Sequence, residues 1–103
     1  MLDLNPKYTA IIRQILTKHI PNQTVWVYGS RIKGTSHEGS DLDLVIMPSP
    51  RTPSTEQLST LKAAFSESDL PILIDITDWE NIPDHFKSEI EKTHAIFQPR
   101  FQG

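Results

Sequence analysis

Residues 25–46 bring together two groups whose chemistry suits a phosphate and a cation. Gly29 and Ser30 follow a short apolar run, and backbone N–H groups at a strand-to-helix turn of this kind can bind an anion. Asp41 follows after ten intervening residues, and Asp43 two positions further on, at the start of a second apolar run. A turn for phosphate followed by a carboxylate pair for a cation indicates a nucleoside triphosphate site.

The carboxylates are the more specific half of this pattern. Asp41 and Asp43 are two residues apart on a predicted strand, so both side chains project to the same face. Like charges that close repel unless a cation or protons neutralise them, and Mg²⁺ prefers such oxygen ligands. Asp75 lies within an otherwise apolar run, where an ionised group is hard to justify structurally. If the two strands pair, three carboxylates could hold two Mg²⁺ ions about 4 Å apart for in-line phosphoryl transfer.

Each part of the pattern also has an ordinary structural interpretation. A Gly-Ser turn is common, and an Asp-x-Asp pair at a strand start often caps a turn. The Ser30 hydroxyl can donate to a phosphate oxygen, and Arg31 or Lys33 can neutralise phosphate charge, but both cations could equally be solvated surface charges. The joint order of strand, Gly-Ser, ten residues, Asp-x-Asp, and a later strand carrying Asp75 favours the nucleotide site.

Composition excludes several other classes. The chain has 103 residues and a net charge of −3, which argues against general nucleic-acid binding. It has no cysteine, which excludes disulfides and thiolate chemistry and is compatible with the cytoplasm. The sequence shows no signal peptide and no apolar run near the roughly 20 residues that span a bilayer. We therefore expect a cytoplasmic protein without a membrane partner.

Helical and strand periodicities alternate along the chain. Asn5 and Pro6 predict the start of a helix over residues 6–19. The other predicted helices are 30–33, 54–67 and 83–92, and the predicted strands are 24–28, 41–47, 72–77 and 94–97. This alternation predicts a single α/β (α+β) domain over residues 1–103, with a small mixed sheet flanked by helices.

The spacing of Gly29, Ser30, Asp41 and Asp43, the run that begins at Ser40, and the strand that carries Asp75 resemble the minimal nucleotidyltransferases of the DNA polymerase β-like superfamily. The resemblance covers nearly the whole chain. It implies that Gly29 and Ser30, with Arg31, Lys33 and Ser40, bind the nucleotide. It also implies that Asp41, Asp43 and Asp75 are catalytic and ligate Mg²⁺, and that ATP is the substrate.

The resemblance also implies a partner. Larger members carry a second, helical domain for the acceptor, and this chain shows none. Minimal members pair with an all-helical HEPN toxin, so we expect a hetero-oligomer in which this chain is the antitoxin and transfers AMP to a hydroxyl of the toxin, a tyrosine. Two alternatives stay open: neutralisation of the partner by binding alone, and nucleotidyl transfer to a small-molecule hydroxyl.

Overall fold

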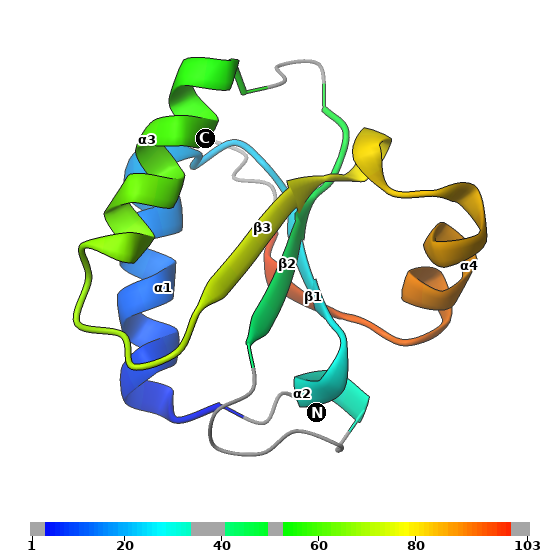
Figure 1. Ribbon diagram of the computed structural model, residues 1–103, viewed down its shortest axis with the longest axis horizontal. Coiled ribbons are helices and arrows are strands. Elements are labelled where there is room, and N and C mark those ends of the chain that lie inside the picture. The colour runs from blue at the N-terminus through cyan, green and yellow to red at the C-terminus, as the bar shows by residue number, and fades with distance from the viewer. Residues whose placement is uncertain (1–3, 34–40, 50–52, 100–103) are drawn as a thin grey trace.

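The fold is a four-stranded mixed sheet with helices on both faces. The computed structural model describes residues 4–33, 41–49 and 53–99. In chain order the elements are α1 (Pro6–His19), β1 (Val25–Tyr28), α2 (Ser30–Lys33), β2 (Leu42–Ile46), α3 (Thr55–Ser66), β3 (Ile74–Asp78), the 3₁₀ turn η1 (Trp79–Asn81), α4 (Asp84–Lys92) and β4 (Ala95–Gln98). The strand order is β3-β2-β1-β4. Helices α1 and α3 lie on one side of the sheet and α4 on the other, which confirms the predicted fold class (Figure 1).

The strand directions follow from the connections. β1 is antiparallel to both β2 and β4, whereas β2 and β3 are parallel. Parallel neighbours need a crossover, and α3 supplies it between β2 and β3. The two carboxylate-bearing strands are therefore adjacent and enter the sheet from the same end.

Local capping fixes the two long helices. The Asn5 side chain accepts a hydrogen bond from the Lys7 N–H at 2.9 Å, and Pro6 occupies the first position of α1. At α3, Ser54 accepts from the Gln57 N–H at 3.1 Å while the Gln57 side chain accepts from the Ser54 N–H at 2.8 Å. This reciprocal capping box places the start of α3 at Thr55.

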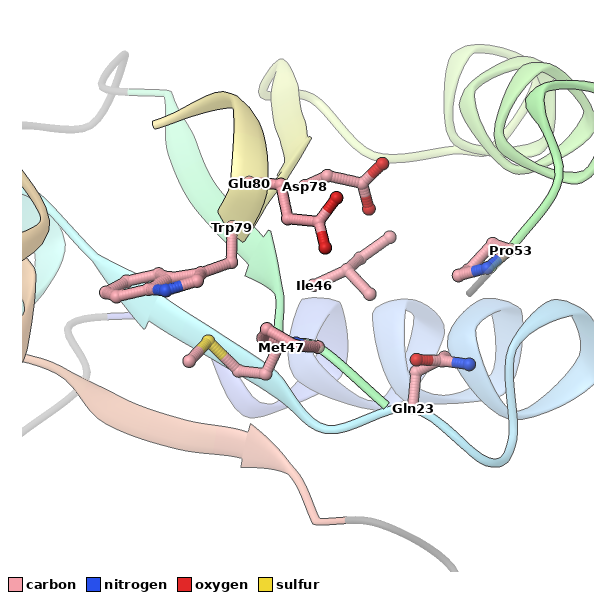
Figure 2. A pocket seen from close by; sticks show the side chains of 8 residues that line it. Gln23, Ile46, Met47, Pro53, Asp78, Trp79 and Glu80 are labelled. Carbon is pink, nitrogen blue, oxygen red and sulfur yellow. The ribbon is translucent and has the colours of Figure 1, made fainter. Parts of the chain in front are cut away.

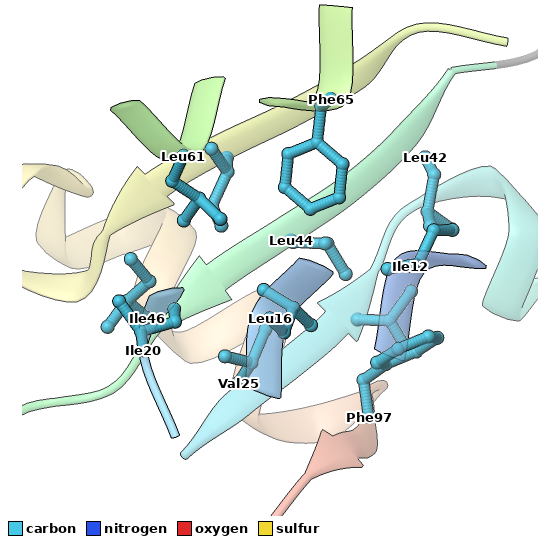
Figure 3. Packing of buried hydrophobic residues seen from close by; sticks show 12 residues of the cluster. Ile12, Leu16, Ile20, Val25, Leu42, Leu44, Ile46, Leu61, Phe65 and Phe97 are labelled. Atoms are coloured by element: carbon cyan, nitrogen blue, oxygen red, sulfur yellow. The ribbon is translucent and has the colours of Figure 1, made fainter. Parts of the chain in front are cut away.

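The main core lies between the sheet and the pair α1 and α3 (Figure 3). Ile12, Leu16 and Leu61 from the two helices are fully buried there. The strands contribute alternate residues to the same core, namely Val25, Val27, Leu42, Leu44 and Ile46. Because side chains alternate along a strand, the residues between these five face α4.

A smaller cluster holds the α4 side of the sheet. It contains Val45 and Ile90, both buried, and Trp26 and Trp79 pack against it. The Trp26 ring stacks on His94 with centroids 3.8 Å apart and meets Trp79 edge to face at 5.6 Å. These aromatic contacts join the two chain segments on either side of α4 to β1, and so hold the helix over this face.

Strand boundaries differ slightly from the prediction. β3 begins at Ile74 rather than residue 72, and it continues to Asp78. Pro71 has no N–H to donate, and the ladder opens with the Leu42 N–H donating to the Leu73 carbonyl at 3.0 Å. Within the described ranges, no helix combines the length and the apolar character that crossing a membrane requires.

Candidate active site

Three polar side chains form a row across adjacent strands. Tyr28 at the end of β1 is the cross-strand partner of Asp43 on β2, and Asp43 is paired in turn with Asp75 on β3. The neighbours of Asp43 in sequence, Leu42 and Leu44, point into the main core. The row therefore lies on the α4 face. The strand of Asp75 pairs beside that of Asp43, which is the condition on which a shared carboxylate site depended.

Two features of the structure require glycine at position 29, beside Asp43. Its φ of +86° lies in the left-handed region that favours glycine. A Cβ at this position would also collide with Oδ2 of Asp43 and would lie 3.3 Å from its Cγ. The absence of a side chain thus lets the backbone turn between β1 and α2 lie directly against the Asp43 carboxylate.

The predicted nucleotide-binding turn is present, but only part of it is described. The Ile32 N–H donates to the Gly29 carbonyl at 3.1 Å at the start of α2. Arg31 is buried, so it is not the solvated surface charge considered as an alternative. Ser40 lies outside the described residues, as do the side chains of Ser30 and Lys33. Nucleotide binding by these residues stays a prediction.

The carboxylates interact electrostatically. Burial raises the pKa of Asp43 above its usual value, and the negative charges of Asp75 and then Asp41 raise it further. Asp41 and Asp75 are themselves exposed. Although Asp75 lies in an apolar run of the sequence, its side chain is exposed, because β3 is an edge strand of the sheet. A bound cation would relieve the repulsion that the neighbouring carboxylates exert on half-buried Asp43.

This donor set fits Mg²⁺ as part of a substrate complex. Across residues 4–33, 41–49 and 53–99, no three carboxylate or imidazole groups converge as a preformed metal cage. Mg²⁺ is commonly held by one or two carboxylates together with substrate phosphate oxygens and water. Asp41 and Asp43 would supply those carboxylates, next to a turn suited to phosphate. The predicted second ion and the metal-ligand role of Asp75 stay predictions.

A pocket of about 190 Å³ opens at the row. Its sheet side is formed by Tyr28, Gly29, Asp43 and Asp75, and its helical side by Phe86, Glu89, Ile90 and Thr93. Whole-ligand pockets usually measure about 300–1,000 Å³, so this one takes only part of a nucleotide or acceptor. Helix α4 thus forms the second wall of a site whose carboxylates Asp43 and Asp75 come from the sheet.

Sequence reasoning missed the aromatic part of this pocket. The Tyr28 ring meets Phe86 edge to face with centroids 5.8 Å apart. Burial, followed by the charges of Asp43 and Asp75, raises the pKa of Tyr28 to about 12. The position of Tyr28 directly before Gly29 was the available signal, whereas the contribution of Phe86 depends on how α4 packs.

A separate small pocket lies at the other end of β2 and β3 (Figure 2). Ile46, Asp78 and Glu80 line it together with Gln23 and Pro53. Burial, then the charge of Glu80, raises the pKa of Asp78, while Lys62 lowers it. Its volume of about 10 Å³ holds about one water molecule. Asp78 pairs with Ile46, which lies three residues beyond Asp43 along β2. This pocket is therefore separate from the row of Tyr28, Asp43 and Asp75.

Comparisons with known proteins agree with this geometry. Residues 11–100 match the family described as polymerase beta, nucleotidyltransferase. The chain is 39% identical over 104 residues to the probable protein adenylyltransferase MntA of Haemophilus influenzae (strain ATCC 51907 / DSM 11121 / KW20 / Rd), an alignment that covers 96% of this chain and 86% of that protein.

Solved structures share the fold. A toxin–antitoxin complex with AMP-PNP superposes with a TM-score of 0.69 at 20% identity, over 86% of this chain and 71% of that chain. A mutant of the toxin–antitoxin MntA-HpeT gives 0.69 at 19% identity, over 91% of this chain and 73% of that one. A second MntA-HpeT mutant gives 0.66 at 21% identity, over 90% and 71%. With the family match over most of its length and the 39% identical relative, the chain belongs to the polymerase β-like nucleotidyltransferases.

Proposed function

We propose that this nucleotidyltransferase is an antitoxin that transfers AMP from ATP to a tyrosine hydroxyl of a HEPN-type toxin. The observation that carries the proposal is the pairing of Asp43 with Asp75 beside the Gly29 turn, in a chain 39% identical to a probable protein adenylyltransferase. The structural neighbours described as toxin–antitoxin complexes, one of them with AMP-PNP, support the choice of partner and nucleotide.

The site residues have different proposed roles in the transfer reaction. The turn at Gly29 and Ser30, with Arg31, Lys33 and Ser40, would orient the triphosphate. Asp41 and Asp43 would hold Mg²⁺, and Asp75 would complete the metal site if a second ion binds. Bound Mg²⁺ supplies charge neutralisation of the phosphate oxygens. Asp75 is exposed on an edge strand, which supports a role in accepting the proton of the acceptor hydroxyl. The acceptor oxygen forms a bond to the α-phosphorus, the bond from that phosphorus to the bridging oxygen breaks, and pyrophosphate leaves.

The test is transfer of label from ATP that is radioactive at the α-phosphate. The chain is incubated with Mg²⁺ and the protein product of its neighbouring gene, and a HEPN-type partner is expected to gain label as pyrophosphate is released. Asp43→Asn should abolish labelling. Asp69→Asn, which changes an exposed aspartate in the turn after α3, is the matched control and should transfer normally. Absence of labelling with the native chain contradicts the proposal.

Two other outcomes have distinct signatures. If Asp43→Asn protects cells from the toxin as well as the native chain does, neutralisation occurs by binding alone. If the isolated chain labels small hydroxyl compounds but not the partner protein, the acceptor is a small molecule. Protection that is lost together with labelling supports the proposed transfer.

A further inference from the structure

Leu73 interrupts the polar pattern of the site face. Along the outer strand, Ile74 and Ile76 pack toward the main core, whereas Asp75 and Thr77 face the other way. Leu73 continues this ladder through its carbonyl, which accepts from the Leu42 N–H at 3.0 Å, so its side chain shares the face of Asp75. It is 74% exposed, the highest value among the large hydrophobic residues of the described chain. An apolar side chain therefore stands in solvent two residues from the proposed catalytic carboxylate.

Phe86 places a second exposed apolar group on the other side of Asp43. It lies on α4, is 42% exposed, and packs against Tyr28 of β1. Because β2 lies between β3 and β1, Leu73 and Phe86 flank the Asp43 carboxylate from opposite sides. In Figure 1, β3 and α4 accordingly lie to either side of the start of β2.

The surface around these two residues is acidic. Asp41, Asp75 and Glu89 are all exposed near the pocket, and Asp41 and Asp75 act together on the pKa of Asp43. Exposed apolar groups set among carboxylates match a protein segment that carries an apolar or aromatic side chain among lysine and arginine residues.

We propose that Leu73 and Phe86 form the docking surface through which a basic segment of the partner protein presents its acceptor hydroxyl to Asp75. The proposal rests on the function proposed above and adds the place and chemistry of contact. Leu73 lies outside the pocket lining and Phe86 forms part of it, so this surface extends from the pocket to the edge of the sheet. Apolar burial supplies affinity at this surface, and the carboxylates favour a basic partner.

The chain contains a matched control. Ile96 is 60% exposed on β4, the opposite edge strand of the sheet. Binding of each variant to the adjacent-gene HEPN-type protein is measured by calorimetry without nucleotide. Leu73→Ser is expected to weaken binding at least tenfold, the effect of removing one buried leucine contact, whereas Ile96→Ser should stay within twofold of the native chain. An equal loss in the two variants, or no loss in Leu73→Ser, overturns the proposal.

Charge variants test the chemistry of the partner. Leu73→Arg should bind more weakly than Leu73→Glu, because a further positive charge repels a basic segment while a negative charge attracts it. The reverse order overturns the assignment of a basic partner. In transfer assays, Leu73→Ser should raise KM for the partner and leave KM for ATP unchanged. Native binding without transfer contradicts only the proposed function, whereas native transfer with an unchanged KM in Leu73→Ser contradicts only the docking surface.

Discussion

The Gly29 backbone and the Asp43 carboxylate occupy adjoining space, so that no side chain fits at residue 29 without displacing the acid. The left-handed φ of Gly29 and the collision of a built Cβ with Oδ2 of Asp43 are independent constraints on the same residue. This close approach joins the turn suited to phosphate to the carboxylate suited to a cation. It brings the two halves of the site into direct contact.

Replacing Gly29 with alanine should therefore damage activity more than stability. We expect Gly29→Ala to lower the free energy of unfolding by about 1–3 kcal/mol, the cost of a strained residue in the left-handed region. Movement of the Asp43 carboxylate should lower AMP transfer at least a hundredfold. Thermal unfolding and labelled-ATP assays measure the two effects, with Gln14→Ala on the exposed face of α1 as the control. Full activity in Gly29→Ala would show that the contact with Asp43 is not required.

Asp43 should make the free chain less stable as pH rises. Burial and the neighbouring Asp75 and Asp41 raise its pKa in the folded state, so its favourable contribution is complete below the unfolded value of 3.8 and is lost as pH rises through the raised folded value. Asp43→Asn removes this decline and should unfold at a higher temperature than the native chain at pH 7.5 without divalent cations.

Added Mg²⁺ provides the complementary measurement. It should raise the unfolding temperature of the native chain at pH 7.5, because a ligand that binds only the folded state stabilises it. The increase should disappear in Asp43→Asn and persist in Asp69→Asn. An equal response to Mg²⁺ in all three proteins would exclude Asp43 from the cation site.

Local sequence was enough to predict the elements and the strands that carry Asp43 and Asp75. The helix over residues 6–19 follows from its periodicity and the Asn5 cap, and the structure has the same bounds. The row could be expected because alternation places Asp43 and Asp75 on defined faces, once their strands are neighbours. The helix depends on signals within a few residues, whereas the row also depends on β2 and β3 being neighbours, which the sequence alone left as a condition.

Features that depend on the docking of distant segments were not predictable in this way. Tyr28 and Phe86 meet only because α4 returns across the face of β1, and no spacing within either segment encodes that contact. The exposure of Asp75 could not be predicted for the same reason, since an apolar run does not reveal that its strand lies at the edge of the sheet. The sequence pattern thus predicts which residues share one face of each helix or strand. Tertiary packing determines which of these faces are exposed to solvent.

Leu44 and Leu73 should show opposite responses to truncation. Leu44 is fully buried at the centre of the main core, so Leu44→Ala should cost about 2–5 kcal/mol of unfolding free energy. Leu73→Ala removes a mostly exposed side chain and should change stability by no more than about 0.5 kcal/mol. Urea unfolding of both variants makes the comparison. A large loss in Leu73→Ala would mean that this leucine serves the fold of the isolated chain.

The Tyr28 hydroxyl should stay protonated throughout the range in which transfer is measured. Burial and the adjacent Asp43 and Asp75 raise its pKa from 10.0 to about 12, because a phenolate there would be both desolvated and repelled. The stability that this shift contributes is complete below pH 10 and is lost as pH rises toward 12. Tyr28→Phe keeps the ring against Phe86 and removes the titrating group, so it should lose less stability than the native chain over that interval. Unfolding followed between pH 9 and 12 tests this, and an identical alkaline decline in the two proteins would show that another group titrates.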